Sequence, residues 1–120
     1  MSESTKELVG LDLDLAVAQA VDLPCTKGGS HDWRASLVTS CQKCQMMLPL
    51  FSKSIEAAMQ IVEKMRERGF AWAAYSNGKG WKIQCYLRDV RGRGQKFSGG
   101  LLPELLCRAA LSALEQNNGL

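Results

Sequence analysis

The fold is decided by the stretch Phe70-Ala-Trp-Ala-Ala-Tyr-Ser-Asn-Gly-Lys-Gly-Trp-Lys-Ile-Gln-Cys-Tyr-Leu-Arg88. The Asn-Gly pair near its centre is a strong hairpin signal, because both residues tolerate positive φ. After the turn, two sets of side chains alternate: Trp81, Ile83, Cys85 and Leu87 against Lys82, Gln84, Tyr86 and Arg88. This alternation predicts two antiparallel strands with one buried face and one solvent-facing face.

Helices are predicted before and after this hairpin. Ser54 is a good N-cap and Gly69 a good C-terminal stop for the helix between them. Its predicted core stripe is Ile55, Ala58, Met59, Val62 and Met65. Pro103 suits the first turn of a last helix that runs to about residue 116. The predicted core stripe of that helix is Leu102, Leu105, Leu106, Ala109, Ala113 and Leu114.

Another helix is predicted at 8–21, with Leu8, Leu11, Leu15 and Ala18 on its core face. Its Leu-Asp alternation is also compatible with a strand, but the alanines that follow favour a helix. A third strand, at the edge of the sheet, is predicted at 95–98. The resulting order is helix, metal loop, helix, strand, strand, strand, helix. It predicts an α+β domain in which helices sandwich a small antiparallel sheet.

Length and composition narrow the class of protein. The chain has 120 residues, of which 46% are apolar and 22% charged, and this predicts one globular domain spanning 1–120. No run of about 18 apolar residues occurs, so no membrane span is expected. The first residues lack the basic start and apolar run of a signal peptide, which predicts a cytoplasmic protein. Five cysteines in a reducing compartment favour metal binding over disulfides.

A candidate metal site lies in the loop at 24–47, between the first two predicted helices. Cys25, His31, Cys41 and Cys44 follow the pattern C-x5-H-x9-C-x2-C, and His31 is the only histidine of the chain. Two cysteines two residues apart can reach the same ion from one tight turn, and a separate Cys and His complete a tetrahedron. We therefore predict that these four residues bind Zn²⁺.

The number of ligands bears on the role of the metal. Four protein ligands leave no open position for water, so the zinc is expected to be structural and to stabilise a loop too polar to fold alone. A zinc-dependent hydrolase would need one of the four to be absent from the shell, and is the weaker alternative. The other two cysteines, Cys85 and Cys107, fall on apolar faces and are expected to be core thiols.

Basic residues suggest a second candidate site. Residues 79–96 contain six bases and one acid, whereas residues 1–24 contain five acids and one base. Glycines alternating with arginines favour the approach of an anion such as a nucleotide or nucleic acid. A solvated loop explains the same pattern, because no aromatic residue for base stacking is interleaved with these charges. The candidate contacts are Arg88, Arg91, Arg93 and Lys96, aided by Lys27, Arg34 and Lys43 of the metal loop.

Three segments resemble one family of small bacteriophage proteins, the phage ABA sandwich. They are the opening at 11–20, the helix at 51–69 with the hairpin after it, and the ending Phe97-Ser…Leu102-Pro-Glu-Leu-Leu-Cys-Arg-Ala-Ala-Leu111. The resemblance implies a phage or prophage origin and a sheet with helices on both sides. It implies no catalytic residue, because these motifs consist of packing and capping residues. Some relatives of this type carry a Cys/His insertion at the place of the metal loop and many lack it.

These observations favour a non-enzymatic binding module over an enzyme. With His31 used as a ligand, no imidazole is left for acid–base chemistry, and no serine has a nucleophile context. We expect a phage accessory protein in the host cytoplasm that contacts a host protein or small ligand, for instance a defence component. Binding of nucleic acid or a nucleotide through the hairpin at 88–96 is the alternative. A homo-oligomer is compatible with the sequence.

Overall fold

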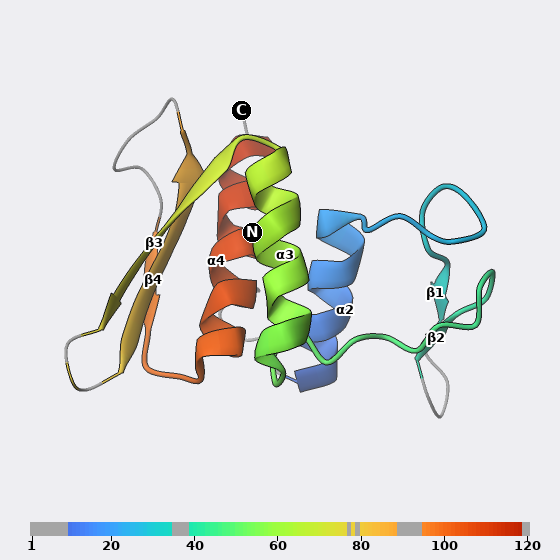
Figure 1. Cartoon of the computed structure of the whole chain (residues 1–120), viewed down its shortest axis with the longest axis horizontal. Coiled ribbons are helices and arrows are strands. Elements are labelled where there is room, and N and C mark those ends of the chain that lie inside the picture. The colour runs from blue at the N-terminus through green and yellow to red at the C-terminus, as the bar shows by residue number, and fades with distance from the viewer. Residues whose placement is uncertain (1–9, 35–38, 77, 79, 89–94, 119–120) are drawn as a thin grey trace.

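The structure is a computed structural model that describes residues 10–34, 39–76, 78, 80–88 and 95–118. Figure 1 shows how its elements are arranged. In chain order they are α2 (Gly10–Val21), β1 (Trp33–Arg34), β2 (Ser40–Cys41), α3 (Ile55–Glu67), β3 (Phe70–Ser76), β4 (Trp81–Leu87), β5 (Lys96–Ser98) and α4 (Leu102–Asn118). The α+β class and the predicted order of helices and strands are confirmed.

The sheet is antiparallel, with strand order β3-β4-β5. Its hairpin pairs Phe70 with Leu87 at one end and Ser76 with Trp81 at the other. The predicted third strand is confirmed as β5, in which Phe97 pairs with Ile83 of β4. Because β4 is the central strand, residues from both neighbours flank each of its side chains on the same face.

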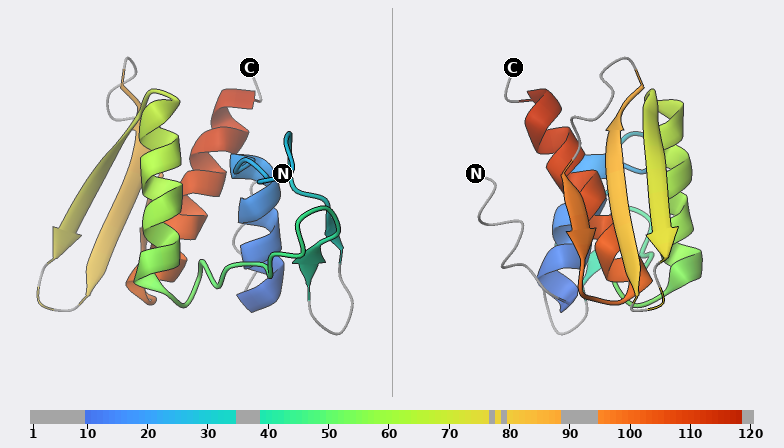
Figure 2. Two further views of the ribbon diagram at one scale, coloured as in Figure 1. Left: turned by 45° about the vertical axis from the view of Figure 1, so that its right-hand side comes forward. Right: turned by 90° about the vertical axis from the view of Figure 1, so that its left-hand side faces the viewer.

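All three described helices lie on the same side of this sheet (Figures 1 and 2). Helix α3 packs on β3, α4 packs on β4 and β5, and α2 packs on the two other helices. In the described part of the chain, helices therefore cover one face of the sheet, whereas the resemblance implies helices on both faces. The alternation in β4 explains it, because Ile83 and Cys85 are buried against the helices while Lys82 is exposed.

Helix α4 is the centre of the core. It packs against α2, α3, β4 and β5, so it is enclosed on several sides. The single apolar stripe predicted for it is too narrow, because all residues from 105 to 114 are buried. Even Arg108 is buried there, and its guanidinium donates to Glu104 Oε1 at 3.1 Å.

The other two helices are rotated relative to their predicted stripes. In α3, Ser54 Oγ accepts a hydrogen bond from Ala57 N and is the N-cap, as predicted. Its buried residues are Ala58, Ile61 and Met65, however, whereas Ile55 and Met59 are exposed. In α2 the buried face runs through Leu13, Asp14, Val17, Ala18 and Val21, and Leu11 is exposed. Leu8 lies outside the described residues.

The ligand-bearing loop forms a separate lobe against α2, on the side away from the sheet (Figure 1). Strands β1 and β2 pair there as a short antiparallel ribbon. The apolar cluster that joins the helices to the sheet contains none of the four predicted metal ligands. Among the described residues, no helix is both long and apolar enough to cross a membrane.

Candidate metal centre

The first ligand is held by a tight loop that follows α2. Backbone hydrogen bonds join Cys25 N to Gly29 O and Gly28 N to Cys25 O, each at 2.9 Å. Gly28 and Gly29 adopt φ of 96° and 67°, values that favour glycine. A bridge between Pro24 and Ser30 then closes the loop. The turn at Gly28 and Gly29 brings His31 close to Cys25 in space.

The last two predicted ligands, Cys41 and Cys44, lie on a second turn, which begins where β2 ends. Gln45 N donates to Cys41 O and Cys41 N donates to Met46 O, both at 2.9 Å, so the chain folds back over the Cys-x2-Cys pair. Trp33 of β1 pairs with Cys41 of β2, which places the histidine-bearing segment beside this turn.

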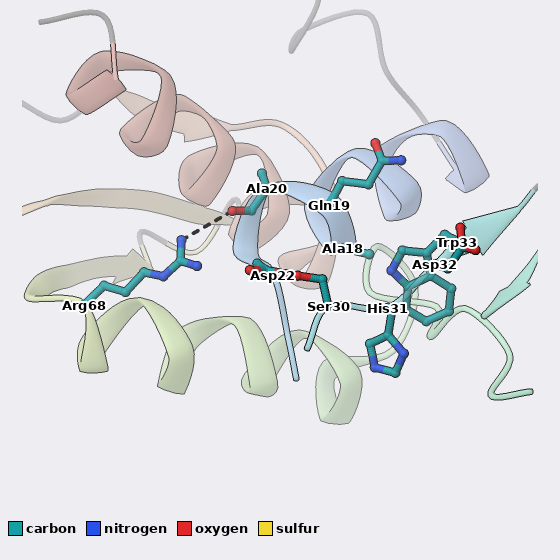
Figure 3. Close-up of a pocket in the computed structure, with 9 residues that line it drawn as sticks. All are labelled: Ala18, Gln19, Ala20, Asp22, Ser30, His31, Asp32, Trp33 and Arg68. Carbon is teal, nitrogen blue, oxygen red and sulfur yellow. Dashed lines mark hydrogen bonds between the residues drawn. The ribbon is translucent and has the colours of Figure 1, made fainter. Parts of the chain in front are cut away.

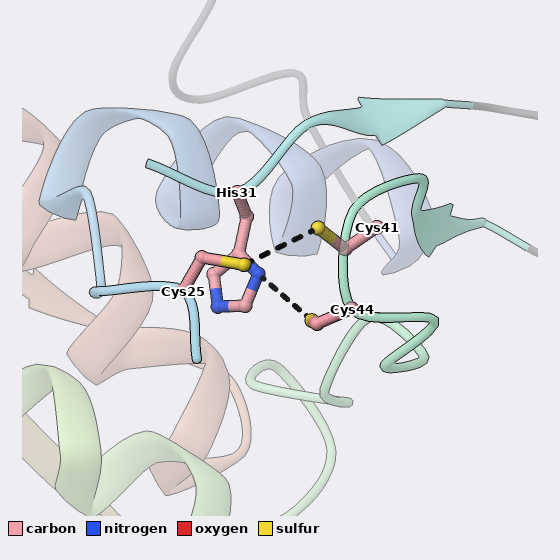
Figure 4. Close-up of side chains that lie close together, drawn as sticks. All are labelled: Cys25, His31, Cys41 and Cys44. Carbon is pink, nitrogen blue, oxygen red and sulfur yellow. Dashed lines mark hydrogen bonds between the residues drawn. The ribbon is translucent and has the colours of Figure 1, made fainter. Parts of the chain in front are cut away.

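The four predicted ligands come together in one cluster, drawn in Figure 4. Their ligand atoms all lie within 4.8 Å of one another. Cys25 Sγ is 3.9 Å from Cys41 Sγ, and Cys44 Sγ is 3.5 Å from His31 Nδ1. All five cysteines are free thiols, so no disulfide competes for these sulfurs. The donor set and its spacing fit a four-coordinate metal ion.

Backbone amides favour the thiolate form that a metal requires. Asp32 N donates to Cys41 Sγ at 3.3 Å, and Lys27 N donates to Cys25 Sγ at 3.5 Å. Burial acts to raise the pKa of Cys41, but hydrogen bonds from backbone amides and His31 outweigh it and lower this pKa to about 5. The pKa of Cys25 is raised, chiefly by burial. Of Cys25 and Cys41, Cys41 is therefore the sulfur more readily present as a thiolate at neutral pH.

Side chains around the ligands hold the lobe together. The rings of His31 and Trp33 lie 4.6 Å apart, so Trp33 packs beside a predicted ligand. Lys43 Nζ donates to Gly28 O and, at 2.8 Å, to Ser30 O. Lys43 thus ties the Cys-x2-Cys turn to the Cys25 loop. Its ammonium group donates within the lobe, and its predicted contact with an anion stays a prediction.

A cavity of about 550 Å³ lies between α2, the end of α3 and the segment that carries His31 (Figure 3). Asp22, Asp32, His31 and Trp33 are among its lining residues. Arg68 also lines it, and its guanidinium donates to Val21 O at 2.6 Å and Ala20 O at 3.3 Å. These bonds satisfy carbonyls at the C-terminal end of α2, so Arg68 fastens α3 to α2.

The other candidate cations are spread over the molecule. Lys27 is exposed on the Cys25 loop, whereas Arg88 and Lys96 are exposed at the sheet. Arg34 belongs to β1, and its side chain lies outside the description. Arg91 and Arg93 lie outside the described residues, so their predicted anion contacts stay a prediction.

Two groups of residues near these sites were missed by sequence reasoning. Met46, Met47 and Leu50, on the segment leaving the metal lobe, are exposed. Tyr75 and Tyr86 lie on strands next to the basic segment and supply aromatic rings that this segment lacks. The sequence of the hairpin could have revealed the two tyrosines. The alternation in the second strand assigns Tyr86 to the solvent-facing side, and a tight turn brings Tyr75 opposite Lys82 on that side.

The described residues form a small α+β domain, in which a three-stranded sheet with helices on one side is joined to a Cys/His lobe that could hold a metal ion. The family model of the phage ABA sandwich domain matches residues 16–111, a range that includes all four predicted ligands. The chain therefore belongs to the phage ABA sandwich domain family. Neither the curated proteins nor the solved structures contain a match to it.

Proposed function

We propose that this chain is a phage-encoded, non-enzymatic binding module whose structural zinc ion holds an apolar surface for a host protein. The observation that carries the proposal is the exposure of Met46 and Met47 directly beyond the Cys-x2-Cys turn. Zinc is the metal of choice for a Cys3His set with tetrahedral spacing. Its closed shell would leave no position for a substrate water, which argues against a hydrolase.

The donor distances support zinc. With Zn–S bonds of about 2.3 Å and a Zn–N bond of about 2.0–2.1 Å, a tetrahedron has S–S edges of about 3.8 Å and S–N edges of about 3.6 Å. The Cys25–Cys41 separation is 3.9 Å and the Cys44–His31 separation is 3.5 Å. Both separations therefore fit edges of one tetrahedron around the ion, and Nδ1 is the histidine atom nearer to a sulfur.

The apolar surface consists of Met46, Met47 and Leu50. Met47 is 64% exposed and Leu50 is 55% exposed, while Leu48 and Phe51 beside them are buried in the helical core. Methionine side chains are flexible and polarizable, and they are common on surfaces that accept protein partners. The buried neighbours fix the backbone, so the exposed side chains are presented at a defined place.

The metal would control this surface through the backbone. Cys41 N donates to Met46 O, Leu48 N donates to Thr39 O, and a bridge pairs Ser40 with Met47. The segment that carries the methionines is thus bonded to the strand that carries a ligand. Loss of zinc is expected to release both, and partner binding would then be lost together with the metal.

The proposal is tested with a pull-down from bacterial lysate, followed by native mass spectrometry of the complex. The wild type is expected to retain a stoichiometric protein partner. Met46→Ser/Met47→Ser is expected to lose that partner while keeping one zinc ion per chain and its helical circular dichroism. The matched control is Leu101→Ser, which removes another large side chain that is 65% exposed, outside the lobe.

Two results would contradict the proposal. One is a partner retained equally by the double methionine variant and by protein stripped of metal. The other is the absence of any stoichiometric protein partner for the wild type. A host defence component is one class of partner that phage proteins of this size would be expected to block, and the partner's identity in the first experiment addresses it.

A further inference from the structure

We propose that the outer face of the three-stranded sheet binds single-stranded nucleic acid. This surface, the outer sheet face, consists of the outward residues of β3, β4 and β5: Ala71, Ala73, Tyr75, Lys82, Gln84, Tyr86, Lys96 and Ser98. No described helix covers it, and it faces the viewer in the right-hand view of Figure 2. It lies on the side of the molecule opposite the metal lobe and is independent of the function proposed above.

Strand pairing brings the relevant side chains onto one face. Tyr75 is directly opposite Lys82, and Ala71 is directly opposite Tyr86. On the other side of the central strand, Lys96 is opposite Gln84 and Ser98 is opposite Lys82. Directly opposed residues in an antiparallel pair point to the same face. The face therefore presents two tyrosines and two lysines around the small side chains of Ala71 and Ala73, and Gln84 at its centre is buried between its neighbours.

The tyrosines are placed to stack on bases. Tyr75 is 52% exposed, and Tyr86 is partly exposed. They lie near opposite ends of the hairpin, about 13 Å apart along the strand direction at about 3.3 Å per residue. Ala73 lies between them, and its small side chain does not block the space above the sheet. Exposed aromatic rings on a sheet are a common platform for unpaired bases, which offer a π-face whatever their sequence.

The charged residues of the outer sheet face indicate which kind of partner it binds. Lys82 and Lys96 are both exposed, and none of the outward residues of the three strands is acidic. Arg88, also exposed, follows the end of β4, where its N–H continues the ladder by donating to Gly69 O. A phosphate backbone complements this charge. A second copy of the chain packed face to face would bring two faces of the same positive charge together, which is unfavourable.

The binding test uses fluorescence anisotropy with a fluorescein-labelled 12-nucleotide oligo(dT) at 50 mM salt. We expect saturable binding that weakens as salt rises, and weaker binding to a 12-base-pair duplex, whose bases are not free to stack. Tyr75→Ala is expected to weaken binding by about five- to 150-fold. Lys82→Ala/Lys96→Ala is expected to lower the log–log salt slope by about 1.4, two phosphate contacts at about 0.7 each.

Controls separate stacking from folding. Tyr86→Phe keeps the ring and is expected to retain binding, whereas Tyr86→Leu keeps apolar bulk without a ring and is expected to weaken it. Lys53→Ala removes an exposed lysine outside the sheet and should leave affinity and salt slope unchanged. Circular dichroism of every variant checks that the fold is intact.

The proposal is overturned by any of three results. They are no binding of oligo(dT) by the wild type at 50 mM salt, equal affinity of Tyr75→Ala and wild type, or tighter binding to the duplex than to the single strand. A dimer that Tyr75→Ala dissociates, seen by light scattering in the absence of nucleic acid, would also overturn it and assign the face to a second copy.

Discussion

Asp14 Oδ1 accepts a 2.7 Å hydrogen bond from the backbone N–H of Ser52. Asp14 belongs to α2 and is fully buried, while Ser52 lies just before α3 and is buried too. One bond therefore joins the first described helix to the segment that leaves the metal lobe. A buried N–H without a partner costs about 1–3 kcal/mol, so this contact matters for both elements.

Replacing Asp14 tests that contact. Asp14→Ala leaves the Ser52 N–H unpaired and is expected to lower the free energy of unfolding by about 2 kcal/mol. Asp14→Asn keeps an oxygen acceptor and is expected to lose less. Urea denaturation measures both, with Asp12→Ala, on the exposed side of α2, as the neutral control. Equal stability of Asp14→Ala and wild type would show that the contact is not needed.

Lys43 is expected to determine how firmly the lobe holds its metal. Lys43→Ala removes the donor to Gly28 O and Ser30 O, so the two ligand-bearing turns lose their link. Loss of groups that support metal ligands typically lowers affinity by about 10–100-fold, and we expect a decrease near the lower value. Competition with a chromophoric chelator measures it. Lys27→Ala, also exposed on the loop, is the control, and equal effects of both variants would contradict the role given to Lys43.

The five cysteines are expected to react with a thiol reagent in three stages. The metal-bound protein at pH 8 should show little reaction, because three sulfurs bind the ion and two are core thiols. A chelator should expose Cys25, Cys41 and Cys44. Burial raises the pKa of Cys85 to about 12 and raises that of Cys107 as well, so both should react only in denaturant. Counting the released chromophore checks this, and five reactive thiols in native, metal-bound protein would contradict it.

Alkaline pH should destabilise the fold through Cys85. Its pKa is about 12 in the folded protein and 9.0 by reference, so the unfolded chain releases this proton first. The associated stability is complete below about pH 9 and is lost as the pH rises from there towards 12, by up to about 1.4 kcal/mol per pH unit. Comparing urea midpoints of wild type and Cys85→Ala between pH 8 and 10.5 isolates the effect. Parallel pH dependences of the two proteins would refute it.

The sequence was sufficient for the features that depend on local pattern. The Asn-Gly hairpin, the Ser54 cap and the Cys/His spacing each specify structure through neighbours in the chain, and the structure confirms the elements that they predicted. The alternation of β4 also predicted a solvent-facing side of the sheet. These signals arise from φ preferences, capping and ligand geometry, which do not depend on distant residues.

Features that depend on distant contacts were predicted less well. Leu11 and Met59 were placed in the core, yet Leu13 and Ile61 lie there instead, because apolar residues occur on more than one face of α2 and α3. The complete burial of α4 follows from packing partners on several sides, which a helical pattern cannot reveal. The buried role of Asp14 was likewise hidden, because a carboxylate in the first turns of a helix is equally typical of a solvated position.

The burial of α4 on several sides has a consequence for how the chain is assembled during synthesis. α4 is the last described element in chain order, and α2, α3, β4 and β5 all pack on it. The elements that are synthesised earlier therefore leave the ribosome before α4 is available to pack on them. Their apolar faces stay exposed until α4 has been synthesised. The two ligand-bearing turns close through contacts at most about 20 residues apart, so a bound metal ion would order that segment before the rest of the chain is complete.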